Sequence, residues 1–130
     1  MTRPILLVTN GALVLGCCCC CWPGACDTVD VWMNPWLPSV VPMSRAWLEG
    51  QPAFGPPAEA TRECARVRHQ DDAGDELAWI GWYVEGQAGH ADVLVSYRKV
   101  DEDWTVLGAF ATIDGAAVVL GDPRAEPAGR

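Results

Sequence analysis

Apolar and polar positions alternate most regularly in the second half of the chain. Four β-prone runs follow one another there, and each is separated from the next by residues typical of turns. These runs cover residues 77–84, 91–97, 104–113 and 116–120. In the second run apolar Val93 and Val95 alternate with polar Asp92 and Ser96, as in a half-buried antiparallel strand. The pattern predicts an antiparallel meander of about four strands.

The connections of this meander differ in their turn signals. Residues 100–103 suit a tight turn, and Asp114-Gly115 suits a two-residue type I′ turn. Residues 85–90 predict a looser connection. Trp79 and Tyr83 alternate with Ile80 and Trp82, so both faces of the sheet carry apolar bulk and both need cover. A helix, a Trp-rich segment, further curling of the sheet or a second subunit could supply that cover.

Residues 57–68 are the best helix candidate. Pro57 suits a first turn, and the acidic residues precede the basic ones, which matches a helix dipole. Ala60, Cys64 and Val67 have the spacing of a buried helix face. We therefore expect an α+β fold with one main helix packed on a curled antiparallel sheet. In architecture alone, this resembles the cystatin-like folds and the cone-shaped nuclear-transport-factor-like folds, and a cone-shaped fold would have its pocket between helix and sheet.

Residues 27–57 are rich in proline, which disfavours long helices and central strands. We expect an extended segment with one or two helical turns at residues 44–49, opened by Ser44 and stopped by Gly50. Tryptophans in this segment and in the sheet are the candidates for binding a ligand, although large aromatic residues more often pin a segment onto the core. They are Trp32, Trp36, Trp47 and Trp82.

The first residues have the pattern of an export signal. Arg3 precedes a mostly apolar stretch over residues 4–16. The end of this stretch, Val14-Leu15-Gly16-Cys17, resembles the processing site of bacterial lipoproteins. The resemblance covers about the first seventeen residues, and it implies that Cys17 is lipidated and becomes the new N-terminus. It predicts a location in the cell envelope, membrane-anchored or secreted.

Two other interpretations of the N-terminus remain open. Asn10-Gly11 lies between two apolar runs and is a strong hairpin signal, which would put these residues inside a cytosolic structural or assembly subunit. Alternatively, residues 5–22 are just long enough to stay as an uncleaved membrane span.

Cysteine usage agrees with a leader followed by one domain. Five of the seven cysteines are contiguous, at residues 17–21, and such a run cannot by itself form a zinc site or a disulfide framework. Cys26 and Cys64 are spaced like a structural pair, and we predict a disulfide between them in an oxidising compartment.

Charge bears on the class of partner. The chain of 130 residues has a formal net charge of −8 and no long basic run. An acidic surface repels phosphate backbones, so nucleic acid is not an expected partner. The expected partners are a protein or a small apolar ligand, with the membrane contacted through the N-terminal anchor, and the chain is a candidate for a homo-oligomer.

No catalytic or cofactor motif occurs in the sequence. His90 and Asp92 are the weak candidates for an acid–base pair of a small hydrolase or isomerase, since residues i and i+2 share a strand face. Acidic residues cluster with His69 at residues 69–76, but their spacing is not that of a calcium loop, so we predict neither a metal nor a cofactor.

The predicted organisation has four parts: a leader (1–16), a Cys-, Pro- and Trp-rich extended segment (17–56), a helix with a meander (57–121) and a disordered tail (122–130). The sequence favours a small exported binding domain of unknown ligand.

Overall fold

The computed structural model describes residues 25–127, which divide into two compact units after Pro35. In the first unit, the described residues form the helix α2 (Ala25–Met33), with Val29, Trp32 and Met33 exposed. Within the described range, no helix is long and apolar enough to cross a membrane. The expected leader, Cys17 and the Asn10-Gly11 hairpin lie outside the described residues.

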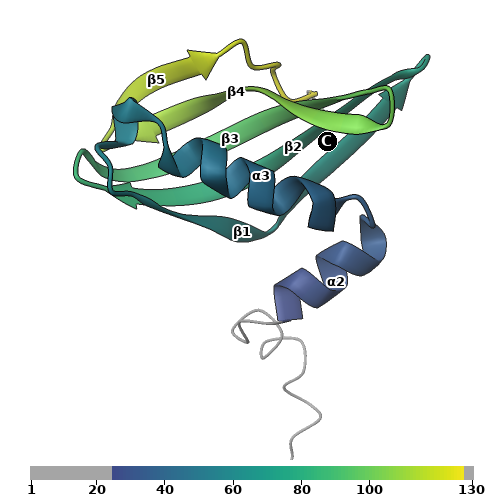
Figure 1. Cartoon of the computed structure of the whole chain (residues 1–130), viewed down its shortest axis with the longest axis horizontal. Coiled ribbons are helices and arrows are strands. Elements are labelled where there is room, and N and C mark those ends of the chain that lie inside the picture. Colours follow the sequence, from purple (N-terminus) through teal and green to yellow (C-terminus); the bar gives the residue numbers. More distant parts are fainter. Residues whose placement is uncertain (1–24, 128–130) are drawn as a thin grey trace, which may run out of the picture. The chain divides into compact units, whose positions relative to one another are not determined.

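The second unit begins at Trp36 and contains a helix followed by a five-stranded sheet (Figure 1). The sheet is antiparallel throughout, and its strands lie side by side in chain order. The elements are α3 (Leu37–Glu49), the short 3₁₀ helix η2 (Pro52–Phe54), β1 (Glu59–Asp72), β2 (Asp75–Gly86), β3 (Gly89–Val100), β4 (Asp103–Ile113) and β5 (Ala116–Gly121). The predicted α+β class is confirmed. The four predicted strands are also confirmed and correspond to β2 to β5, and β1 is a fifth strand.

The hairpin turns follow the local sequence. Asp114 and Gly115 have φ values of 46° and 88°, so the predicted two-residue turn with left-handed central residues is confirmed. The predicted tight turn between β3 and β4 is also confirmed, with Asp101 and Glu102 at its centre. The connection of residues 85–90 is tighter than expected, because Gly86 and Gly89 are still paired and only two residues link them.

The prediction of a helix over residues 57–68 is wrong, because residues 59–72 form strand β1. The charges that matched a helix dipole also fit a strand, since Arg66 and Arg68 alternate with Val67 and His69 at a period of two. Both ends of β1 pair with β2, on either side of an irregularity between Arg62 and Val67. This pairing supplies the backbone hydrogen bonds that make the segment a strand and not a helix.

The prediction of an extended segment before the sheet is wrong as well. The main helix is α3, which contains Pro38 in its first turn and Pro42 inside. A proline inside a helix costs about 3 kcal/mol, but α3 buries four side chains at the 3,4,4 spacing of one helix face. These are Leu37, Val40, Ser44 and Leu48.

Helix α3 covers one face of the sheet, which we call the helix face (Figure 1). The buried side chains of the helix face lie side by side on the neighbouring strands β2 and β3. They are Ile80, Trp82, Val84, Ala91, Val93, Val95 and Tyr97. We call the other side the open face, and it contains the side chains that alternate with these, Trp79 and Tyr83 among them. The predicted division of the sheet into two apolar faces is therefore correct.

A chain of hydrogen bonds joins α3 to the middle of the sheet. The Tyr97 hydroxyl lies within hydrogen-bond distance of Ser44 Oγ and 3.2 Å from Trp82 Nε1, and Ser44 Oγ lies 2.8 Å from the Val40 carbonyl oxygen. A hydroxyl has only one hydrogen to donate. Every donor is therefore used once if the Trp82 N–H donates to the Tyr97 hydroxyl, the Tyr97 hydroxyl donates to Ser44 Oγ, and the Ser44 hydroxyl donates to the Val40 carbonyl. Burial raises the pKa of the Tyr97 phenol far above its usual value, so the hydroxyl stays protonated.

Replacing Tyr97 by Phe tests this chain. The substitution leaves the buried Trp82 N–H without its acceptor, so we expect the free energy of unfolding to fall by about 1–3 kcal/mol. Tyr83→Phe is the matched control, because its hydroxyl is on the open face and its side chain is 41% exposed, and we expect a change below about 0.5 kcal/mol. Urea unfolding measures both, and equal losses would show that the buried chain adds nothing.

Candidate functional site

The tryptophans proposed as ligand contacts have different environments. Trp82 is fully buried on the helix face, where the Arg45 guanidinium lies 5.7 Å from its ring, and Trp47 is half-buried against the core. These two therefore fasten α3 to the sheet. Trp32 is 84% exposed and belongs to the first unit, and Trp36 is half-buried at the start of α3.

Trp36 forms an aromatic cluster with Trp104 of β4 and His69 of β1. The ring centroids of the two tryptophans are 5.2 Å apart, and His69 lies 5.9 Å from Trp36 and 6.0 Å from Trp104. His69 and Trp104 lie on the helix face near the turns of the β1–β2 and β3–β4 hairpins, and Trp36 packs against them. The cluster attaches the start of α3 to the sheet, and neither Trp104 nor His69 was among the predicted ligand contacts.

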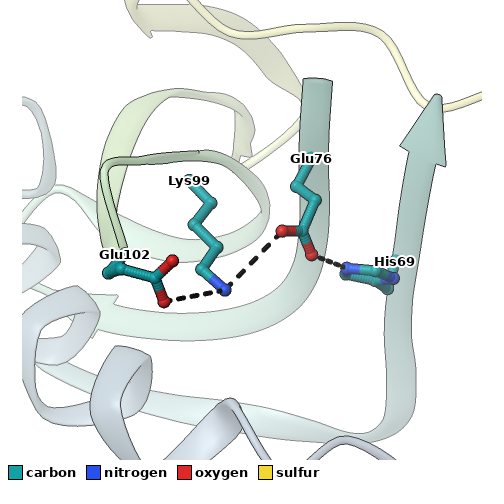
Figure 2. Close-up of polar contacts among 4 residues, drawn as sticks. All are labelled: His69, Glu76, Lys99 and Glu102. Atoms are coloured by element: carbon teal, nitrogen blue, oxygen red, sulfur yellow. Dashed lines mark hydrogen bonds and ion pairs between the residues drawn. The ribbon is translucent and has the colours of Figure 1, made fainter. Parts of the chain in front are cut away.

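A polar network extends from His69 (Figure 2). His69 Nε2 is 3.0 Å from one Glu76 carboxylate oxygen, Lys99 Nζ is 3.6 Å from the other, and Lys99 also lies 3.8 Å from Glu102. The hydrogen bond from His69 lowers the pKa of the Glu76 carboxyl below its usual 4.5; partial desolvation opposes this, and the charge of Lys99 adds to it. The network is partly exposed and joins β1, β2 and β3 through His69, Glu76 and Lys99.

The predicted acid–base pair is not brought together as a pair. His90 is exposed at the start of β3 on the open face, and its Nδ1 lies 3.0 Å from the Tyr83 hydroxyl and 3.3 Å from the Glu85 carboxylate. Its ring stacks on Tyr83 with centroids 6.0 Å apart. Asp92 is exposed on the same face, next to Tyr83 in the register. The histidine is therefore held by Tyr83 and Glu85.

Two of the acidic residues near His69 act as ion-pair partners. Asp75 binds Arg98 at 3.1 Å, and Glu76 binds His69 and Lys99 as described. Within residues 25–127, no group of three or more metal-ligating side chains is placed to hold an ion. The side chains of Cys26 and Cys64, like Cys17, lie outside what the structure describes, so the disulfide remains a prediction.

The two edges of the sheet differ in whether their main-chain groups are protected from pairing with another strand. At edge strand β1, α3 provides two side chains to Ala60: the Ala60 N–H donates to Glu49 Oε2 at 2.9 Å, and its carbonyl accepts from Arg45 Nε at 3.2 Å. The register shift after Arg62 and the many charged residues of β1 further discourage pairing with another strand.

Edge strand β5 has none of these protections. Its six residues, Ala116–Gly121, include no charged residue and no proline. On the open face Val119 is 61% exposed and lies opposite Phe110, which is 39% exposed and lies opposite Leu94. We call Leu94, Phe110 and Val119 the apolar row. This row and the β5 edge form the candidate interaction surface.

The sequence contains one signal for this surface, an uncharged run at the end of the meander. Such a run predicts a strand and does not by itself predict a binding edge. Comparisons add no assignment: the chain matches no protein-family model, and no curated protein or solved structure is significantly similar to it.

The charge network predicts a pH dependence of stability. The Glu76 carboxyl has a lower pKa in the folded chain than in the unfolded one, so its stabilising contribution is present above about pH 4.5 and is lost as the pH falls through the folded-state pKa. We expect Glu76→Gln to be less stable than the parent near pH 7 and to lose less stability on acidification to about pH 3.

Urea midpoints at the two pH values measure the effect. Glu102→Gln is the matched control, because it removes a carboxylate from Lys99 while leaving the His69–Glu76 contact intact. If the difference between the parent and Glu76→Gln were the same at both pH values, the network would not contribute through ionisation.

Proposed function

We propose that the chain is an exported, lipid-anchored protein-binding domain whose partner docks on the β5 edge and the apolar row. One observation carries the proposal: the β1 edge is protected by Glu49, Arg45 and its own charges, whereas the β5 edge is uncharged and adjoins exposed apolar side chains. An edge of this kind is a template for an added strand.

Strand addition would combine two kinds of recognition. The free main-chain groups of β5 would bind the partner's backbone, and the side chains on either face would contact the partner's alternate residues. Val119 is exposed on the open face, while Val118 and Leu120 pack partly against the core on the helix face. The added strand would thus extend both faces of the sheet.

The filled helix face favours a protein partner over a small apolar ligand. Trp82 and Tyr97 occupy the middle of that face, both fully buried and hydrogen-bonded to each other. Of the two layouts expected, we therefore favour the cystatin-like one, since a cone-shaped fold would keep a pocket between helix and sheet. The same filling argues against a hydrolase or isomerase site in that position.

The anchor belongs to the proposal through the sequence at Cys17. Stable attachment by acylation needs more than one chain, because a single myristoyl chain gives marginal binding. Helix α2 follows the cysteine run after a few residues and exposes Trp32, a residue type favoured at membrane interfaces. A membrane-attached domain with an exposed binding edge fits the envelope location expected from the sequence.

The intact mass of protein purified from its native membrane tests the anchor. We expect a chain that begins at Cys17 and carries added acyl mass, and we expect a variant with serine at all five positions 17–21 to yield neither the cleavage nor the added mass. A full-length mass without lipid would overturn the lipid anchor and make the N-terminal hairpin or an uncleaved span the alternative.

A photo-crosslinking amino acid at position 119 tests the binding edge. Incorporated in the full chain in its native membrane, it should give one discrete adduct whose protein is identified by mass spectrometry. The matched control is the same amino acid at Thr61, which is also exposed on the open face but lies on the protected edge strand β1.

An adduct of a second copy of the chain identifies a homo-oligomer, and an adduct of another envelope protein identifies a hetero-complex. Each supports a binding edge at β5. Equal adducts at both positions, or none at position 119, would contradict it.

A further inference from the structure

The residues after β5 cross the open face of the sheet, and residues 122–127 are held there. The prediction of a disordered tail is wrong for these six residues. They follow a row of residues that lie directly opposite one another across all five strands. We call this row the tail groove, and its members are Arg68, Trp79, Ser96, Gly108 and Gly121.

Three members of the tail groove contact the tail in the order in which it crosses the strands: Ser96 of β3, Trp79 of β2 and Arg68 of β1. The Arg124 N–H donates to Ser96 Oγ at 2.9 Å, and the Arg124 carbonyl accepts from Trp79 Nε1 at 2.9 Å. Farther along, Arg68 Nη1 donates to the Pro127 carbonyl at 3.1 Å, and Arg68 Nε lies 3.6 Å from the Glu126 carboxylate.

The groove has the properties of a built site. Trp79 is only 2% exposed and Ser96 is fully buried, so two polar groups on the open face are enclosed and have the tail's main chain as a partner. At Gly108, an added Cβ would lie 2.9 Å from Pro123 Cδ and closer still to backbone atoms, so only glycine lets the tail approach there. Small residues thus leave room, and Trp79 and Arg68 provide donors.

Most of these contacts recognise a peptide backbone and not a particular side chain. Three hydrogen bonds go to tail main-chain groups, whereas side-chain recognition is limited to the Glu126 carboxylate and to Pro123 against Gly108. The groove therefore suits any extended segment with proline at the first position and an acidic residue three positions later.

From these contacts we propose that the tail groove is a peptide-binding site, occupied in the isolated chain by its own tail. Its ligand is an extended Pro-x-x-acidic segment of a partner protein, which displaces residues 122–127. The apolar row lies in the next position along the same strands, since Leu94 and Phe110 are two residues from Ser96 and Gly108. The proposal rests on the proposed protein-binding function and names a second contact of the same partner.

The experiment uses the full chain with a weakened tail. Arg124→Pro removes the N–H that binds Ser96, and Glu126→Lys reverses the charge that faces Arg68, so the double variant R124P/E126K should free the groove. Arg124→Ala keeps the N–H and is the matched control. The probe is a synthetic peptide with the sequence of residues 122–130, and the observed signals are the indole N–H resonances of Trp79 and Trp82 in ¹⁵N-labelled protein.

We expect the Trp79 signal to shift in R124P/E126K and to return to its parental position when the peptide is added. The peptide should bind this variant about tenfold or more tightly than it binds Arg124→Ala, where the intact tail competes. A peptide with Glu126→Lys should bind several-fold more weakly, since it loses the contact with Arg68. The buried Trp82 signal should stay unchanged, which verifies that the variant is folded. If the Trp82 signal changes in R124P/E126K, the single variant R124P is used in its place.

A Trp79 signal that does not respond to millimolar peptide in a folded variant would overturn the peptide site and leave the tail as a structural strap. Equal binding of the normal and the Glu126→Lys peptides would overturn the acidic preference. Both results are obtained with purified protein and a defined peptide, so they are independent of the adduct at position 119 that tests the proposed function itself.

Discussion

The Tyr97 hydroxyl connects the two layers of the fold. It accepts from Trp82 within the sheet and binds Ser44 of α3, so a polar atom in the centre of the core has its partners within the core. Because of this connection, one helix can pack over the middle of the helix face, where Trp82 and Tyr97 are both buried. In the described part of this unit α3 is the one α-helix, and it covers the helix face. The open face is therefore left to be covered by other means, and the tail covers part of it.

The cover on the open face is uneven. At one end, residues 122–127 enclose Trp79 and Ser96. Without the tail, the Trp79 indole and the Ser96 hydroxyl would be exposed on the open face. Two residues farther along the strands, Phe110 and Val119 remain exposed. The same face therefore combines a groove occupied by a peptide segment and an apolar row without cover. In a chain with net charge −8, the apolar row is an uncharged part of the surface.

The sequence predicted the meander well because its signals are local. Period-two alternation and turn residues such as Asp114-Gly115 determine β2 to β5 without reference to the rest of the chain. The main helix was misplaced because two tertiary effects outweigh local preference. Pairing with β2 makes a strand of residues whose charges fit a helix, and burial of Leu37, Val40, Ser44 and Leu48 offsets the cost of Pro42.

The candidate surface was harder to predict for a related reason. The face that α3 covers decides whether Trp82 faces solvent or the core. The strand order decides whether β5 is an edge strand or a central strand. Neither is a property of a short window of sequence. The tail is the clearest case: residues 122–127 contain three charged residues, two prolines and one alanine, which is the composition of a disordered end. They are held mainly because the groove binds their backbone, and backbone binding requires no apolar or alternating pattern in the bound sequence. Its trace lies in the groove, where small Ser96 and Gly108 stand in line with the donors Trp79 and Arg68 across four strands.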